Sequence, residues 1–371
     1  MHDDNSLRVL HVAEILPGGV SSYLSDLLPH QLESLGAGRV AILGPENQLD
    51  HIPEMDGLLR FGFIRNGRSL RSLAALFLRL RKVIRSFKPD IVHLHSSLAG
   101  VVGRLPGLFT GIPRPAIVYT AHGWAIDPAR PSRHRALLVG VEKTLAGLSD
   151  VIINISEHES EFLESFGFPK DKLRFVLTGL GEGEYEPAID TWPPEDGPIR
   201  LLFAGRFAFE KGFDLLYPEL VALPSGSVIC RVAGSGEDNR GRAYASTSNV
   251  EMLGWLSREE VSREVARCDA LIMPSRSEGL PIAALEAMRA AKPVFGSNRG
   301  PFPGLLRDGV DGVLMDIDKP GFLADALKGQ TRETLATMGK AARARFEERH
   351  RSEAMARKIE QIYRELHLRN G

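Results

Sequence analysis

The chain has 371 residues, enough to bury two ordinary domain cores rather than one. With 43% apolar and 25% charged residues it has the composition of a soluble globular protein, and its net charge of −1 excludes a strongly basic nucleic-acid-binding chain. The two cysteines, Cys230 and Cys268, favour a reducing compartment over a disulfide framework. The polar residues 1–6 are unlike a signal peptide, and no run of about 18 apolar residues occurs, so we expect a cytoplasmic protein.

The first half of the chain alternates between short apolar strands and amphipathic helices. A strand is predicted at residues 7–13, and a helix at 20–35 follows the turn that contains Gly18 and Gly19. A strand, a glycine turn and a helix in this order open a doubly wound α/β sheet. Further strands are predicted at residues 39–43, 91–94, 116–120, 151–153 and 173–177, and further helices at 70–87 and 133–148.

A stretch with four prolines and no apolar period, residues 186–198, predicts a linker to a second series of the same kind. We therefore expect Rossmann-like parallel-sheet domains at residues 1–185 and 199–350, and a C-terminal helix at 351–371 that packs back toward the N-terminal domain. Two such domains that face each other form a cleft at the carboxyl ends of their strands, where ligands bind in open α/β sheets. In the second half, strands are predicted at 199–204, 228–232, 270–273, 293–295 and 312–315, and helices at 213–222, 258–267, 281–290 and 331–347.

Two cations flank the first strand–helix turn of the second half. Arg206 follows Gly205 at the end of the strand, and Lys211 precedes Gly212 at the start of the helix. Fixed cations beside the backbone N–H groups of a helix N-terminus suit a diphosphate. A solvated basic pair on a loop is the equally weighted alternative.

Two glutamates lie on and after a later loop. Glu278 precedes Gly279, Leu280 and Pro281, and Pro281 suits the first turn of a helix that carries Glu286. A carboxylate on an otherwise apolar helix needs donor partners, which ribose hydroxyls could supply. The alternative is a Glu286 that is exposed or that pairs with Arg289.

Glu278 and Glu286, separated by seven residues, resemble the E-x7-E motif of retaining glycosyltransferases. The surrounding motifs match as well, beginning with Gly205-Arg206 and Lys211-Gly212. With this set the chain resembles family 4 of the retaining glycosyltransferases, which have the GT-B fold, and the members that build bacterial polysaccharides in particular. The further motifs are Gly18-Gly19-Val20, His93-Leu94-His95, Thr120-Ala121-His122-Gly123-Trp124, Gly234-Ser235-Gly236 and Gly254-Trp255-Leu256.

The resemblance implies a hexosyltransferase that uses a UDP- or GDP-linked sugar and a glycan or lipid-linked saccharide acceptor. It implies catalytic roles for Glu278, His122, Arg206 and Lys211, with the two cations on the diphosphate and Glu286 on the ribose. It assigns the acceptor to the N-terminal domain, with His95 and His122 as acceptor-side candidates. The donor-binding residues that it implies are Gly18, Gly19, Arg206, Lys211, Gly234, Gly236, Trp255, Leu256, Glu278, Gly279, Leu280, Pro281 and Glu286.

Metal-independent transfer is predicted, because fixed cations are present and no Asp-x-Asp element is placed to hold a metal at the diphosphate. His93 and His95 share one face of a strand and could bind a metal, but no third ligand is evident, and hydrogen bonding at the cleft is favoured. Two other functions stay open: a nucleotide-sugar 2-epimerase of the same fold, and a non-catalytic sugar-nucleotide-binding protein.

The helix at 70–87 is amphipathic and strongly basic. Such a helix either is an ordinary surface helix with solvated charges or contacts anionic lipid. Because the N-terminal domain should bind a lipid-linked acceptor, we expect this helix to make peripheral contact with the cytoplasmic membrane. The basic residues proposed for this contact are Arg71, Arg79, Arg81, Lys82 and Arg85.

Overall fold

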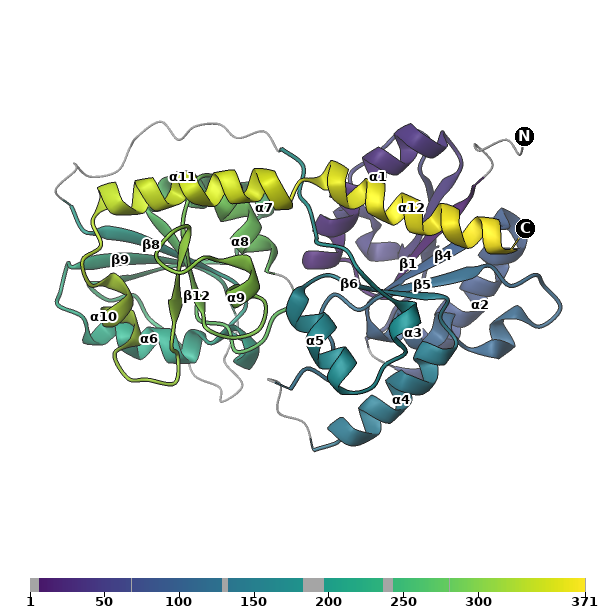
Figure 1. Cartoon of the computed structure of the whole chain (residues 1–371), viewed down its shortest axis with the longest axis horizontal. Helices are drawn as coiled ribbons and strands as arrows, with labels where there is room; N and C mark the ends of the chain where they lie inside the picture. Colours follow the sequence, from purple (N-terminus) through teal and green to yellow (C-terminus); the bar gives the residue numbers. More distant parts are fainter. Residues whose placement is uncertain are drawn as a thin grey trace. The chain divides into compact units, whose positions relative to one another are not determined.

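The computed structural model describes residues 7–67, 69–128, 133–182, 197–235, 243–279 and 281–370. The chain divides into two compact units (Figure 1): unit 1 is Met1–Gly181 with Arg351–Gly371, and unit 2 is Glu182–His350. Each unit has its own parallel sheet with helices packed on it, so the two-sheet α/β fold expected from the sequence is confirmed.

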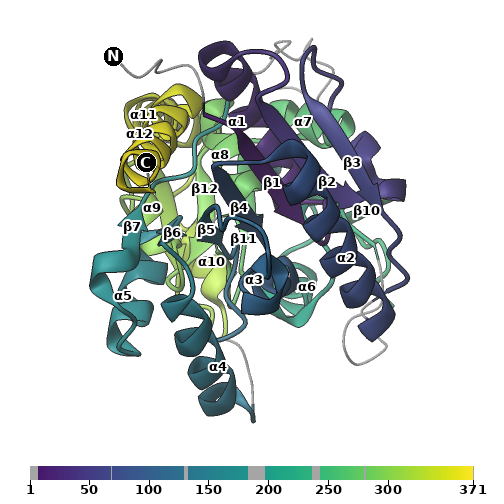
Figure 2. The same ribbon diagram turned by 90° about the vertical axis from the view of Figure 1, so that its right-hand side faces the viewer.

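Unit 1 contains, among the described residues, a seven-stranded sheet in the order β3-β2-β1-β4-β5-β6-β7, which crosses Figure 2 from right to left. Every neighbouring pair is parallel. All residues of β1, β2, β4 and β5 are buried, as expected for a parallel sheet covered on both faces. The strands are β1 (Val9–Ala13), β2 (Val40–Pro45), β3 (Leu59–Phe63), β4 (Ile91–His95), β5 (Ala116–Thr120), β6 (Val151–Asn154) and β7 (Leu173–Phe175).

The helices of unit 1 cover the two faces of this sheet. One apolar cluster joins alternate strand residues to α2 (Leu70–Phe87), α3 (Ser97–Gly103), α4 (Arg135–Gly147) and α5 (Glu157–Ser165). The first helix, α1 (Gly19–Leu35), packs instead against the last one, α12 (Ser352–Asn370), which also contacts β5. Figure 1 shows the two, purple and yellow, side by side. His30 on α1 bonds the Ser352 hydroxyl at 2.9 Å, so the end of the chain is part of unit 1.

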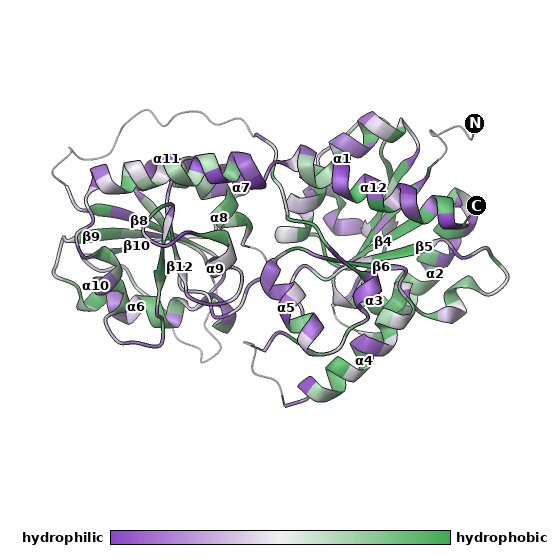
Figure 3. Ribbon diagram, viewed as in Figure 1, coloured by the Kyte–Doolittle hydropathy of each residue, from purple (hydrophilic) through white to green (hydrophobic). Residues whose placement is uncertain are grey.

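Unit 2 contains, in its described part, a six-stranded parallel sheet in the order β10-β9-β8-β11-β12-β13. Its strands, largely green in Figure 3, form the apolar centre of the unit. The strands are β8 (Ile199–Ala204), β9 (Val228–Ala233), β10 (Val250–Gly254), β11 (Ala270–Met273), β12 (Val294–Ser297) and β13 (Gly312–Met315). The helices are α6 (Phe213–Ala222), α7 (Arg258–Arg267), α8 (Ile282–Arg289), α9 (Phe302–Leu305), α10 (Phe322–Leu327) and α11 (Arg332–Arg349).

Several short elements were missed in the sequence, and each lacks the usual signal. Strand β3 is an edge strand, mostly half-buried and interrupted by Gly62, so it shows no continuous apolar run. Helix α3 has seven residues, two of them glycine, and no side-chain cap. Helix α5 has acidic residues in its first turn and a side-chain N-cap, because the Ser156 hydroxyl accepts a hydrogen bond from the Glu159 N–H. That capping pattern could have been found in the sequence.

Candidate functional site

In unit 2 the predicted donor residues gather where adjacent parallel strands end. The loops after β8, β9 and β11 meet at this edge, and two glycines permit the close approach. A Cβ on Gly212, which has a φ of +70°, would lie 2.0 Å from the Pro274 carbonyl oxygen, and a Cβ on Gly234 would lie 2.1 Å from that of Gly205. Both positions therefore require glycine, because any side chain would overlap backbone atoms.

Lys211 and Glu278, from two of these loops, form one charged pair. The Lys211 Nζ donates to both carboxylate oxygens of Glu278, at 2.7 and 2.9 Å. The Ser275 hydroxyl donates to the same carboxylate at 2.9 Å, and its carbonyl accepts a bond from the Ser297 hydroxyl at 2.6 Å. These bonds fix the carboxylate and place a lysine directly beside it, at the C-terminal edge of the sheet.

Arg276 locks the same loop in place, a role that the sequence did not reveal. Its guanidinium donates to both oxygens of Asp214 on α6, at 2.7 and 2.9 Å, and stacks on the Phe209 ring with 4.1 Å to the centroid. Its backbone N–H donates to the Glu210 carbonyl at 2.7 Å. A bidentate pair combined with stacking suits arginine and not lysine. No local pattern joins residues 62 positions apart, so this pair could be found only in the structure.

The other predicted charges of unit 2 differ in exposure. The Arg206 side chain is 68% exposed and lies 3.9 Å from Glu210, so it is available to a ligand. Glu286 on α8 is buried and lies 3.4 Å from the Arg258 guanidinium of α7. Arg258 is therefore one charge partner of the Glu286 carboxylate, which is not exposed.

The remaining predicted residues of unit 2 that the structure describes lie in the loop after β10 and in the loop that leads into α8. Trp255 follows β10 and is 70% exposed, and Leu256 is half-buried. Gly279 is buried, and Pro281 is the N-cap residue of α8. Gly236 and Leu280 lie outside the described residues. Lys211, bonded to Glu278 on the loop that leads into α8, and the exposed Arg206 make this edge of the sheet suitable for an anionic ligand.

In unit 1, Gly18 and Gly19 lie where β1 gives way to α1. Gly18 has a φ of +95° and is the N-cap residue, and Gly19 is the first residue of the helix. The positive φ explains the need for glycine at this turn. Both residues follow the carboxyl end of a central strand of the unit 1 sheet.

His122 follows β5 and lies in front of a buried row of histidines. It has a φ of +55°, which is uncommon for a residue other than glycine. His95 is fully buried, and its Nδ1 is bonded to His122 Nε2 at 2.9 Å while its Nε2 is bonded to His11 Nδ1 at 3.0 Å. His95 therefore contacts other histidines on both sides. Burial lowers the pKa of His122 to about 3 and that of His11 to about 4.

His11, His93 and His95 supply nitrogens that lie within 4.8 Å of one another, close enough to consider a metal. All six ring nitrogens already have hydrogen-bonding partners, however. His93 pairs with Tyr363 of α12 at 2.5 Å and with Thr120 at 2.8 Å, and His11 Nε2 pairs with Gln31 at 2.7 Å. A metal would have to replace these bonds, so the geometry favours a hydrogen-bonded cluster.

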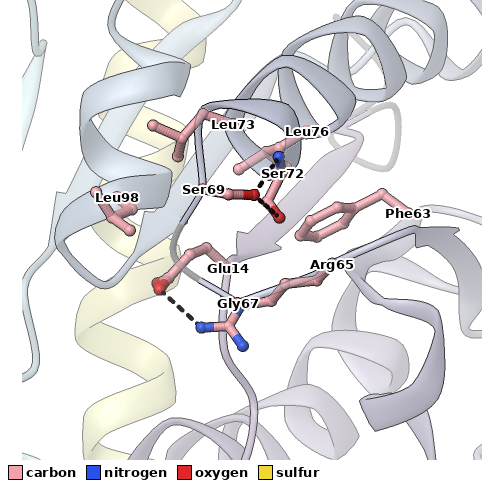
Figure 4. Close-up of a pocket in the computed structure, with 9 residues that line it drawn as sticks. All are labelled: Glu14, Phe63, Arg65, Gly67, Ser69, Ser72, Leu73, Leu76 and Leu98. Carbon is pink, nitrogen blue, oxygen red and sulfur yellow. Dashed lines mark hydrogen bonds and ion pairs between the residues drawn. The ribbon is translucent and has the colours of Figure 1, made fainter.

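A small pocket in unit 1 is lined by Glu14, which follows β1, and by residues of α2 and α3 (Figure 4). Its polar wall is Glu14, which accepts a bond from the Ser96 hydroxyl at 2.9 Å and lies 3.6 Å from the Arg65 guanidinium. Its volume of about 10 Å³ has room for about one water molecule. The pocket is therefore too small for a sugar.

The basic helix α2 divides its cations into two groups. Arg79 donates to the Gly62 carbonyl at 2.9 Å, and Arg81 donates to the Leu108 carbonyl at 2.6 Å, so both bind neighbouring loops. Arg71, Lys82 and Arg85 are exposed. In the part of the chain that the structure describes, no helix has the length and apolar character needed to cross a membrane.

Comparison with known proteins covers both units. The family model "Glycosyltransferase Family 4" matches residues 17–180, and "Glycosyl transferases group 1" matches residues 184–351. An uncharacterized 41.2 kDa protein of the cps region of Klebsiella pneumoniae is 26% identical, over 96% of this chain and 99% of its own length. The UDP-Gal:alpha-D-GlcNAc-diphosphoundecaprenol alpha-1,3-galactosyltransferase of Escherichia coli is 23% identical over 70% of each chain.

Solved structures share the fold at low identity. Sucrose-phosphate synthase from Thermosynechococcus elongatus has a TM-score of 0.81 and 18% identity, over 97% of this chain and 99% of its own. Anabaena HepE in complex with UDP-glucose has a TM-score of 0.76 and 19% identity, over 96% and 99%. The consecutive family matches and the two parallel-sheet units lead to the same assignment. The chain belongs to the family 4 glycosyltransferases of the GT-B fold.

Proposed function

We propose that the chain transfers a hexosyl unit from a nucleoside-diphosphate sugar to a glycan or lipid-linked saccharide acceptor, with retention and without a metal, in bacterial polysaccharide biosynthesis. The observation that carries this proposal is the pair of cations after β8: Arg206 is exposed, and Lys211 is fixed beside Glu278. Fixed positive charge stabilises a departing diphosphate, which is the role that a metal serves elsewhere. The name of the Escherichia coli relative, a UDP-galactose transferase that acts on a lipid diphosphate, supports this class of donor and acceptor.

The proposed reaction breaks the bond between the sugar anomeric carbon and the diphosphate oxygen. The acceptor hydroxyl oxygen bonds to that carbon from the same face, and its proton passes to the leaving diphosphate. Arg206 and Lys211 neutralise the charge that develops on the leaving group. Glu278 and the N–H groups near Gly279 hold the sugar, Glu286 accepts bonds from the ribose, and His122 contacts the sugar.

A screen of UDP- and GDP-linked hexoses tests this proposal. In the presence of EDTA, one donor is expected to raise the melting temperature and to be slowly hydrolysed, and an added saccharide acceptor should receive the sugar. Loss of both effects in EDTA, with recovery on added Mg²⁺ or Mn²⁺, would show that the metal-independent part is wrong. Isomerisation of the donor without an acceptor would identify a 2-epimerase, and the absence of any binding would remove the donor site.

Contact with an anionic membrane is a second part of the proposal, and the structure sharpens its test. Arg71, Lys82 and Arg85 are exposed on α2, next to Leu78, which is 66% exposed. Each basic side chain near an anionic surface contributes about 1 kcal/mol, so changing all three to glutamate should weaken vesicle binding by roughly 100-fold or more. Sedimentation with phosphatidylglycerol vesicles at low and high salt measures this effect.

A charge-matched control separates position from net charge. Arg133, Lys143 and Lys170 are exposed in unit 1 but lie outside α2, and their change to glutamate alters the net charge equally. If both triple variants lose binding to the same extent, α2 is not the contact. Arg79 and Arg81 are unsuitable test positions, because their substitution also removes bonds to neighbouring loops.

A further inference from the structure

A continuous chain of hydrogen bonds runs through unit 1 from α1 to His122. It begins at Gln31 Oε1, which lies 2.7 Å from His11 Nε2. His11 Nδ1 lies 3.0 Å from His95 Nε2, and His95 Nδ1 lies 2.9 Å from His122 Nε2. The four side chains come from α1, β1, β4 and the turn after β5, so strand pairing and helix packing hold them in order.

This chain has a direction in the structure, where the Gln31 side chain turns its carbonyl oxygen and not its amide nitrogen to His11. The Gln31 carbonyl oxygen has no proton, so His11 must donate from Nε2. A neutral imidazole has a single N–H, so His11 Nδ1 must accept from His95 Nε2, and His95 Nδ1 must accept from His122 Nε2. His122 is then left with an unprotonated Nδ1 that can only accept.

The surroundings keep the three rings neutral and fixed. Burial lowers the pKa of His11 to about 4 and that of His122 to about 3, and it lowers the pKa of His95 well below its ordinary value. The Tyr23 ring meets the His122 ring edge-on, with centroids 4.7 Å apart. Among the described residues, no hydrogen-bonding partner is found for His122 Nδ1, and the residue is half-buried rather than enclosed.

We propose that Gln31, His11 and His95 are positioning residues that fix His122 as a hydrogen-bond acceptor for a hydroxyl group of the sugar ligand. The inference rests on the proposed function, since it names the chemistry that one of its contacts recognises. A neutral nitrogen lone pair accepts from O–H and repels the oxygens of a carboxylate or phosphate. The site therefore selects a sugar with a hydroxyl, and not an acidic group, at this position.

Histidine-selective ¹⁵N labelling tests the inference without any turnover assay. His122 signals, assigned by their loss in His122→Ala, should show a protonated Nε2 and an unprotonated Nδ1 in the wild-type protein. In Gln31→Leu the chain loses its fixed end, and His122 should become a mixture of both tautomers. A wild-type His122 that carries its proton on Nδ1 would overturn the inference, whatever the enzyme transfers.

Kinetics supply a second test through non-additivity. Gln31→Leu should reduce kcat/KM about tenfold, the effect of one weakened hydrogen bond, and should have no further effect in a His122→Ala background. A tenfold loss that persists in that background would show that Gln31 does not act through His122. Thr120→Val is the matched control, because it removes a buried hydrogen bond to His93 on the same sheet face, outside the chain.

The remaining alternative is a metal held by the same rings. Zn²⁺ added to wild type should leave the melting temperature unchanged. A zinc-dependent rise that is absent in His11→Gln would overturn the inference in favour of a metal site. If no nucleotide sugar is bound or used by the wild-type protein, the proposed function fails, and the tautomer measurement still decides whether the hydrogen-bond chain fixes His122.

Discussion

Replacement of Lys211 by alanine is expected to lower kcat/KM for glycosyl transfer about 10³-fold, most of it in kcat. The lysine is fixed beside Glu278 by bonds of 2.7 and 2.9 Å, so its charge is in place before the diphosphate begins to leave. Preorganised charge of this kind stabilises the transition state more than the bound donor. Steady-state kinetics at saturating acceptor, with EDTA present, measure the effect.

Two further variants separate the loss of a catalytic charge from damage to the loop. Lys319→Ala removes an exposed lysine of unit 2 that pairs with Asp316 at 2.8 Å, and it should retain full activity. The double change Lys211→Ala with Glu278→Gln removes both charges and keeps an acceptor for Ser275. If the double variant regains wild-type activity, the unpaired carboxylate and not the missing cation caused the loss, and the proposed role of Lys211 is wrong.

Unit 1 is expected to lose stability steeply between pH 6.5 and about pH 4. In the folded state burial lowers the pKa of His11 to about 4, whereas an unfolded histidine has a pKa of about 6.5. The folded state therefore binds fewer protons in this window, so stability is complete above pH 6.5 and falls as the pH falls. At pH 5 His11 alone costs about 2 kcal/mol, and His122 adds a similar cost.

Urea unfolding at pH 7 and pH 5 measures this loss, with Trp124 as a probe confined to unit 1. Trp124 is buried, and Trp192→Phe with Trp255→Phe leaves it as the sole tryptophan of the chain. His11→Gln should make the pH dependence shallower, whereas His51→Gln, at an exposed position, should leave it unchanged. Equal pH dependence in all three proteins would mean that His11 is not held neutral in the folded state.

The fold class could be predicted because buried parallel strands are short apolar runs separated by amphipathic helices. The helix at Leu70–Phe87 and the strand at Ala116–Thr120 agree with their predicted bounds. The helix is buried on one face and the strand is buried along its whole length, and the spacing of apolar residues in the sequence indicates both patterns. Edge strands such as β3 have only partial burial, so their pattern is too weak to read.

The candidate site could be predicted only where the chemistry lies within a local motif. Lys211 and Glu278 were singled out separately, but their bond joins two loops 67 positions apart. The Arg276–Asp214 pair and the hydrogen-bond chain from Gln31 to His122 have no local sequence pattern either, because each depends on which strands are neighbours in the sheet. The alternation of His93 and His95 along one strand predicts that the two share a face. His11 lies beside them only because β1 pairs with β4, and strand pairing cannot be read from a local pattern.

The return of the chain to unit 1 at Arg351 has a consequence for its synthesis. Residues 182–350 form a contiguous unit, whereas unit 1 needs α12, which supplies the Tyr363 hydroxyl to His93 and Ser352 to His30. Domains generally fold as units while the chain emerges from the ribosome. The part that is translated first is therefore completed last, and a released chain that ends at residue 350 should have a folded unit 2 beside an N-terminal sheet that lacks α12.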